Sequence, residues 1–309
     1  MLFIDSQQYL DLYRLSGRKV LLGLLAKVSD RVFVTSQIAD EVTRNKVGVA
    51  HKFFTDHFKG LGEEFKAIGK SLPDQLFSDT VTSELQAKLK AIPDCIKGVR
   101  KSADKAVVDL LQQIGRSEDD VSRALAGIFG RAVDANQSEL DRARARKERG
   151  KAPGKPRDAL GDQINWEQFL TCAEKWPQVW IISRDGDYCH KYAETTVLNA
   201  ALYHDLTQKH HGIVVHCFTE MEKGLRAFIE ANGVLDAQLL TPDEAERINK
   251  EQEALPPRGW MDSDDGAWDF VVQQNVAHRR SLQAAITARS ATMHFDNDVL
   301  PAPPLGTLE

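Results

Sequence analysis

Residues 179–188 read VWIISRDGDY, a short apolar run that leads directly into charged residues. The run at 179–182 is β-branched and aromatic, which favours a buried β-strand over a helix. A strand that only had to end could use glycine or asparagine, and a desolvated carboxylate costs free energy unless it is paired. The sequence Asp185-Gly186-Asp187 is therefore either a simple turn or a carboxylate placed at a strand's C-terminal end to hold a metal ion.

The segments on either side alternate between strands and helices. Short β-branched stretches predict strands at 2–5, 31–36, 179–183 and 212–218. Apolar residues at helical spacing predict helices at 7–15, 20–28, 36–45, 161–176, 195–210 and 220–233. Ser36 is the expected N-cap of the third of these helices. Strands separated by helices predict an α/β fold, in which helices cover both faces of a parallel sheet.

Residues 46–150 interrupt this alternation, because their apolar residues follow helical spacing and β-branched runs are absent. We interpret this stretch as a long helical insertion within a domain that spans residues 1–235. Residues 236–309 then form a C-terminal extension that is partly helical, with one more helix expected at 267–291. We expect the end of the chain to be flexible unless it docks.

Composition argues against several classes of protein. The chain has 309 residues and a net charge of −5, so it is not expected to coat DNA or RNA, although a local basic track remains compatible with an enzyme. No apolar stretch approaches the roughly 18–20 residues that span a bilayer, and the first residues lack the basic region of a signal peptide. The cysteines stand singly, without metal-site spacing, so we expect reduced thiols in a cytoplasmic protein: Cys95, Cys172, Cys189 and Cys217.

Four carboxylates are expected to meet at one edge of the sheet. Asp5 and Asp185 each follow a predicted strand, and the carboxyl ends of parallel strands form the ligand-binding edge of such sheets. Glu41 and Asp162 lie near the starts of helices that leave the same edge. Taken singly, each acid could be a turn, a solvated helix residue or a cap. Together they would repel one another unless Mg²⁺ or Mn²⁺ lies between them, and such a site can activate water for phosphodiester cleavage.

The chain resembles the PIN-domain nucleases, in particular the larger bacterial PIN-like type with a helical insertion. The stretches that carry the resemblance cover roughly residues 1–235 and occur in the family's order: LFIDSQQYLDLYR, VTSQIADEVTRN, GKAPGKPRDALGDQINWEQFL, WIISRDGDY and VLNAALYHDL. The resemblance implies a three-layer α/β/α domain with a five-stranded parallel sheet. It also implies metal-dependent cleavage of RNA or single-stranded nucleic acid.

The resemblance assigns roles to individual residues. It makes Asp5, Glu41, Asp162 and Asp185 the metal-holding catalytic acids, with Asp187 as an auxiliary metal ligand. Residues expected to support the ligands from behind are Ser6, Gln7 and Ser183. The family often has Asp-Thr/Ser-Asn after the first strand, and Gln7 departs from that pattern because its amide reaches further.

A basic block precedes the third acid. Residues 142–157 read RARARKERGKAPGKPR and hold eight Lys or Arg against a single Glu. Cations that meet phosphates release counterions and so add affinity without reading sequence, whereas many charge runs simply pair with nearby acids. We expect a nucleic-acid track made of Arg142, Arg144, Arg146, Arg149, Lys151, Lys155 and Arg157.

Three functions compete. The first is an endonuclease with Mg²⁺ or Mn²⁺ as cofactor that acts on RNA, or on single-stranded DNA, as its partner. The second is a catalytically silent module that binds nucleic acid or protein. The third, a phosphohydrolase or phosphoacceptor, ranks lowest because Gln7 stands where a second Asp would be expected. Self-association, a protein inhibitor and a partner from the same system remain open, and no membrane partner is expected.

Overall fold

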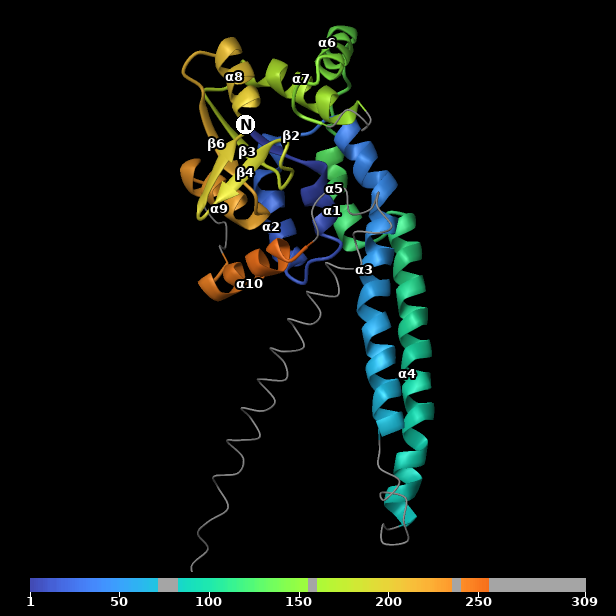
Figure 1. The fold of residues 1–309 in the computed structure, drawn as a ribbon. Helices are drawn as coiled ribbons and strands as arrows, with labels where there is room; N and C mark the ends of the chain where they lie inside the picture. Colours follow the sequence, from blue (N-terminus) through green and yellow to red (C-terminus); the bar gives the residue numbers. More distant parts are fainter. Residues whose placement is uncertain (72–82, 155–159, 235–239, 256–309) are drawn as a thin grey trace, which may run out of the picture. The chain divides into compact units, whose positions relative to one another are not determined.

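The computed structural model describes residues 1–71, 83–154, 160–234 and 240–255 (Figure 1). Met1–Leu255 form one compact unit. The predicted helix at 267–291 and the expected flexible end lie outside the described residues. Within the described part of the chain, no helix is both long and apolar enough to cross a membrane.

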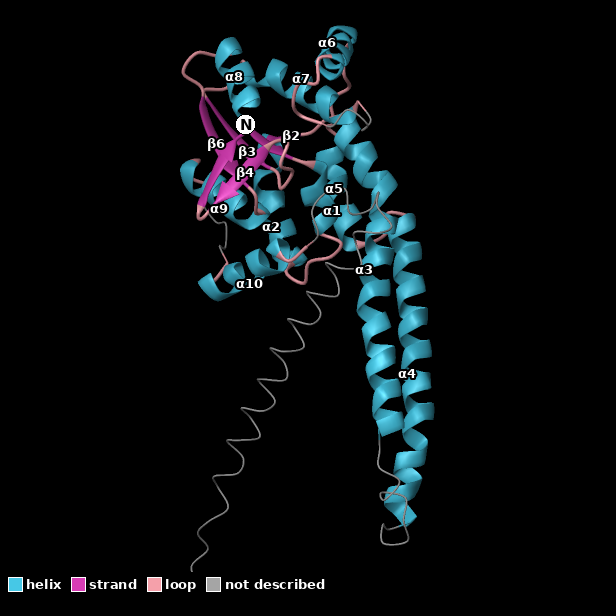
Figure 2. Cartoon of the chain, viewed as in Figure 1, coloured by secondary structure: helices cyan, strands magenta, loops and turns pink. Residues whose placement is uncertain are grey.

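A parallel sheet forms the centre of this unit (Figure 2). Its strands are β1 (Leu2–Ile4), β2 (Val32–Phe33), β3 (Gln178–Ile182) and β6 (Val214–Phe218), in the order β2-β1-β3-β6. All three neighbouring pairs are parallel. β1 and residues 179–182 of β3 are buried and continuously apolar, as expected for a sheet covered on both faces. The described residues therefore give four parallel strands where the resemblance implied five.

Helices cover both faces of the sheet and make three layers. On one face, α7 (Gly161–Ala173) packs through Phe169, whose ring centroid lies 5.1 Å from that of Phe3. On the other face, α9 (Met221–Ala231) packs through Phe228, 5.0 Å from Trp180 between ring centroids. The remaining helices of these layers are α1 (Ser6–Asp11), α2 (Arg18–Val28), followed by the short 3-10 turn Ser29–Arg31, and α8 (Ala200–Lys209). The predicted α/β/α architecture is confirmed.

The insertion is helical, as predicted. It comprises α3 (Ser36–Ser71), α4 (Ser83–Gly115), α5 (Asp120–Phe129) and α6 (Gln137–Glu148). The helices α3 and α4 lie side by side (Figure 1). Lys46 of α3 donates hydrogen bonds to the hydroxyls of Ser117 and Ser122, at 2.6 and 2.9 Å, and so fixes the returning chain against α3. The insertion thus grows out of a helix that begins at the sheet.

Two local predictions were wrong. The N-cap of α3 is Thr35, whose hydroxyl accepts a hydrogen bond from the amide of Ile38 at 3.1 Å, whereas the Ser36 hydroxyl donates to Asp134. The expected helix at 195–210 begins only at α8, which Asn199 caps. The β-branched residues before it form β5 (Thr195–Leu198), which pairs antiparallel with β4 (Cys189–Tyr192).

The compact unit extends past the predicted domain end at residue 235. Helix α10 (Pro242–Glu253) packs against the loop before α2, since a Cβ on Gly17 would lie 2.3 Å from Cγ1 of Ile248. Gln252 of α10 accepts a hydrogen bond from the amide of Met221 at 2.9 Å. Helix α10 therefore belongs to the same folded unit as the sheet.

Candidate functional site

Asp5 and Asp185 lie at the carboxyl ends of neighbouring strands and share one serine. The Ser183 hydroxyl donates to Oδ2 of Asp5 at 3.0 Å and accepts a hydrogen bond from the amide of Asp185 at 3.1 Å. Ser6 donates to the other Asp5 oxygen at 3.3 Å. Asp5 is 1% exposed and Asp185 is 8% exposed. One serine hydroxyl thus ties the carboxylate of Asp5 to the backbone of Asp185, and both acids follow neighbouring strands at the sheet edge.

The backbone fixes this arrangement. The amide of Asp5 donates to the carbonyl of Ile182 at 3.0 Å, and the amide of Ser183 donates to the carbonyl of Phe218 at 3.0 Å. The ladders of β1, β3 and β6 therefore continue one residue beyond the strands. Gln7 lies half-buried in the first turn of α1.

Asp187 connects this edge to the loop that precedes Asp162. Its amide donates to Oδ1 of Asp185 at 2.9 Å, and its own carboxylate accepts a hydrogen bond from the amide of Gly154 at 3.1 Å. Gln163 holds the same loop by donating to the carbonyl of Pro153 at 2.8 Å. Asp187 thus has a structural role in addition to its predicted role as an auxiliary ligand.

Asp162 enters the site from the first turn of α7. Asp162 is only 3% exposed, and its backbone carbonyl accepts a hydrogen bond from the Tyr188 hydroxyl at 3.4 Å. A carboxylate in the first turn of a helix is stabilised by the helix dipole. Tyr188 follows Asp187 directly, so Asp162 is held next to the loop that carries Asp185.

Glu41 lies on α3, one turn beyond a residue that packs against the start of α7. A Cβ on Gly161 would lie 2.6 Å from Nε2 of Gln37, so the Gln37 side chain packs against the residue before Asp162. Residues four apart share a face of a helix, which places Glu41 one turn beyond Gln37 on that face. Thr35 locks the two helices together by donating to Oδ1 of Asn165 at 2.5 Å. Glu41 is half-buried there.

The charges of Asp5 and Asp185 both act on Cys189. The pKa of the Cys189 thiol is raised by its hydrogen bond with Cys217, by burial and by both carboxylate charges. Burial and the charge of Asp5 also raise the pKa of Tyr9. A pair of buried carboxylates favours a cation nearby, and their hard oxygen donors suit Mg²⁺ or Mn²⁺.

The four acids do not form a closed ligand set. In the part of the chain that the structure describes, no group of three or more His, Cys, Asp or Glu side chains is placed so that it could hold a metal ion. The structure links Asp5 and Asp185 through Ser183, and it places Asp162 and Glu41 on adjoining elements.

Sequence reasoning missed an ionic network behind Asp185. The guanidinium of Arg184 pairs with Asp11 at 2.8 Å and donates to the carbonyls of Gln252 and Leu255 at 3.0 and 3.1 Å. Arg14 pairs with the same Asp11 carboxylate. Because successive residues of an extended chain point to opposite sides, Arg184 anchors the segment from behind while its neighbours reach the acidic edge.

The basic block needs a correction. Arg146 is 7% exposed and pairs with Glu167 and Asp205, both at 2.7 Å, and it also donates to the carbonyl of Ala152. Arg142 pairs with the other Glu167 oxygen at 2.8 Å. Both guanidinium groups hold α6 on α7. The expected place of Arg146 in the nucleic-acid track is wrong because its guanidinium is buried in ion pairs, whereas Arg142, whose side chain is 38% exposed, stays a predicted member.

The rest of the block remains a candidate track. Arg144, Arg149 and Lys151 are exposed, and Arg144 is ion-paired with the equally exposed Asp141. Lys155 and Arg157 lie outside the described residues. The sequence holds a signal for these ion pairs, since Arg142 and Arg146 are four residues apart on one helix face and Glu167 lies among apolar residues of α7.

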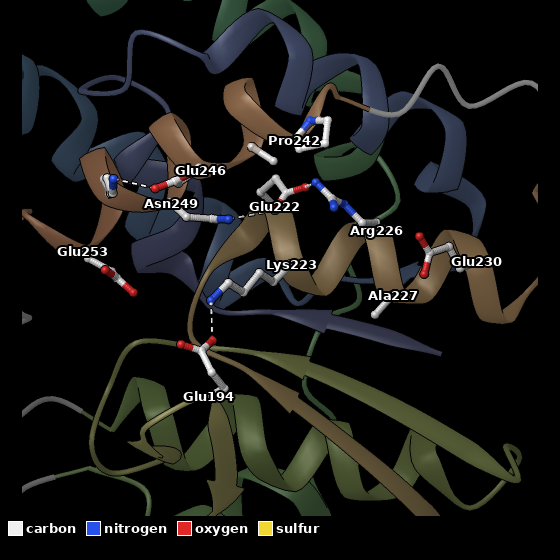
Figure 3. Close-up of a pocket in the computed structure, with 12 residues that line it drawn as sticks. Glu194, Glu222, Lys223, Arg226, Ala227, Glu230, Pro242, Glu246, Asn249 and Glu253 are labelled. Carbon is white, nitrogen blue, oxygen red and sulfur yellow. Dashed lines mark hydrogen bonds and ion pairs between the residues drawn. The ribbon is translucent and has the colours of Figure 1, made fainter.

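A separate groove lies between α9 and α10 (Figure 3). Its volume is about 470 Å³. Buried Glu222 in its wall pairs with Arg226 and accepts a hydrogen bond from Asn249 at 2.9 Å, and Lys223 pairs with Glu194 across its rim. None of the predicted site residues lines this groove, and its charges are largely paired with one another.

Comparison with known proteins supports the family and goes no further. No curated protein and no solved structure matches the chain. The sequence profile described as a PIN-like domain matches residues 1–197, which include β1 to β4 and all four predicted acids. The chain therefore belongs to the PIN-like domain family.

Proposed function

We propose that this protein is a metal-dependent endonuclease that cleaves phosphodiester bonds, with RNA as its first-choice substrate. Membership of a family of nuclease-type folds supports the general class. The observation that carries the proposal is the Ser183 bridge, because it ties the buried carboxylate of Asp5 to the backbone of Asp185, another buried acid, where α/β sheets bind their ligands.

Each acid has a distinct part in the proposal. Asp5 and Asp185 would hold a divalent cation, and Asp162 and Glu41 would complete its oxygen ligands from α7 and α3. A bound Mg²⁺ or Mn²⁺ supplies a Lewis acid that lowers the pKa of a coordinated water and offsets charge on the phosphate. Ser183 and Ser6 keep the Asp5 carboxylate oriented by donating hydrogen bonds to both of its oxygens.

The test combines metal binding with cleavage. Mn²⁺ binding to the full chain is measured by calorimetry, and cleavage of labelled structured RNA, single-stranded RNA and single-stranded DNA is measured with Mn²⁺, Mg²⁺ or chelator. We expect binding and metal-dependent cutting in the wild type. Asp185→Asn should lower both by at least about 100-fold, since losing a group that only supports a ligand already costs 10–100-fold.

Asp30→Asn is the matched control, because this aspartate is 71% exposed in the turn that precedes β2, at the opposite ends of the strands from the acidic edge. It should bind Mn²⁺ and cut like the wild type. Folded wild-type protein that binds no Mn²⁺ and cuts no substrate would contradict the proposal. That outcome would favour the catalytically silent binding module, with which the absence of a closed ligand set in the described residues is consistent.

A further inference from the structure

The β4–β5 hairpin presents a bare face directly after the acidic edge. Its register pairs His190 with Val197 and Tyr192 with Thr195. All four side chains are exposed, at 85% for Tyr192 and 58% for Val197. The opposite face carries the buried side chains of Cys189 and Leu198 and the half-buried side chain of Thr196. It also carries Lys191, whose amino group is ion-paired with Glu220 and Glu253. The hairpin is thus anchored on one side and bare on the other.

This bare face adjoins the candidate site. A Cβ on Gly186 would lie 3.9 Å from Cε1 of His190, so the imidazole stands over the glycine between Asp185 and Asp187. Tyr192 follows Asp187 by five residues, which limits their separation to about 17 Å. His190 and Tyr192 lie about 7 Å apart along the strand on the same face. The rings of His190 and Tyr192 therefore follow one another along the strand, with His190 nearer to the acidic edge.

The chemistry of this face suits unstacked bases. Tyr192 is the most exposed of the large apolar and aromatic side chains in the described residues. A single exposed apolar residue needs no explanation, but here an aromatic ring, an imidazole and a valine share one sheet face whose strand positions hold no carboxylate. The carboxylate of Glu194, in the turn of the hairpin, is paired with Lys223. Aromatic rings stack on bases of any sequence, and a face without acids does not repel the phosphates that accompany those bases.

We propose that the outer face of the β4–β5 hairpin is a stacking platform for a single-stranded nucleic acid whose phosphates enter the acidic edge. Tyr192 stacks on one base, and His190 contacts the nucleotide nearer to Asp185. The platform rests on the proposed nuclease function for the class of substrate, and it makes the protein select unpaired over duplex strands, because a base inside a duplex offers no free face.

The test measures binding without cleavage. A fluorescent single-stranded RNA of mixed sequence, about 16 nucleotides long, is titrated with the full chain in chelator over a range of salt concentrations. We expect Tyr192→Ala to weaken binding about 5- to 150-fold. Tyr192→Phe should bind like the wild type. The slope of log affinity against log salt should stay unchanged, because stacking releases no counterions.

Tyr203→Ala is the matched control, since this tyrosine is 49% exposed on α8, outside the hairpin. It should bind like the wild type. A second measurement needs no variant: RNA that carries 4-thiouridine should crosslink to β4 on irradiation, at a peptide identified by mass spectrometry.

Four outcomes would overturn the platform: wild-type protein that binds no strand, unchanged affinity in Tyr192→Ala, a lowered salt slope in that variant, or crosslinks confined to other elements. A dimer seen by sedimentation that Tyr192→Ala dissociates without loss of RNA affinity would instead make this face a contact between copies.

The two proposals fail separately. If Tyr192→Ala still cuts in a metal-dependent way with an unchanged KM, only the stacking platform is contradicted. If RNA binding depends on Tyr192 but the wild type cuts no substrate with any metal, only the nuclease function is contradicted.

Discussion

Arg146 provides the sharpest test of the corrected basic block. Its guanidinium is 7% exposed and contacts two carboxylates at 2.7 Å, those of Glu167 and Asp205. Breaking a buried ion pair by removing one partner costs about 3–5 kcal/mol, because a buried charge is left uncompensated. Glu167 keeps its pair with Arg142, and Asp205 is partly exposed, so we expect a loss near the lower limit, about 3 kcal/mol, for Arg146→Met.

The assay is urea unfolding followed by circular dichroism, with Arg144→Met as the matched control. Arg144 and its partner Asp141 are 56% and 59% exposed, so that variant should change the free energy of unfolding by at most about 0.5 kcal/mol. Under the same conditions, RNA affinity should fall more in Arg144→Met than in folded Arg146→Met. The reasoning is refuted if Arg146→Met is as stable as the wild type yet binds RNA more weakly, because that result would return Arg146 to the nucleic-acid track.

Three further predictions concern packing, backbone strain and pH. Gly224→Ala should destabilise the protein by about 1–3 kcal/mol in the same urea assay, because the new Cβ would lie 2.5 Å from Cδ1 of Ile182. Gly127→Ala is the control: a Cβ at Gly127 meets no atom within 4 Å, so this variant should be neutral or stabilising. Ala193→Gly should stabilise the hairpin turn by about 0.5–1 kcal/mol, since Ala193 has a φ of 50°, and equal or lower stability would argue against strain there. Burial raises the pKa of Tyr13 to about 12. Between pH 10 and 12 the unfolded chain therefore loses this proton more readily than the folded chain, and the free energy of unfolding should fall as the pH rises. Tyr13→Phe should make this fall smaller in urea unfolding measured at alkaline pH.

The parts of the fold that follow from local periodicity were predictable from sequence. The apolar stretches that became β1, β3 and β6 are short and separated by helical segments, and a parallel sheet covered by helices suits that pattern. The same rule misread residues 195–198, because Thr-Thr-Val-Leu runs without a break into the helical spacing of α8. Asn199 separates the two elements, because its side-chain oxygen accepts a hydrogen bond from the amide of Ala201, and an asparagine at a helix N-cap is the sequence signal that was overlooked.

Side-chain pairs that join distant segments were not predictable. Arg184 finds Asp11 across 173 residues of sequence, and Arg146 finds Asp205 only because α6, α7 and α8 pack together. Sequence shows that a basic run exists but not which of its guanidinium groups turn inward. The expected convergence of the acids on one sheet edge rested on topology, and the Ser183 bridge between Asp5 and Asp185 is its most direct structural support.

The continuity of α3 has a mechanical consequence. One rigid rod carries Glu41 near its start and runs on to Ser71, with Lys46 fixed to the returning chain between them. From Lys46 to Ser71 is about 38 Å along the helix, but from Lys46 to Glu41 only about 8 Å. A rod that tilts about this anchor moves its far end roughly five times as much as its near end. A swing of about 5 Å at Ser71 would shift Glu41 by only about 1 Å, so motion at the far end of α3 reaches the acidic edge strongly reduced.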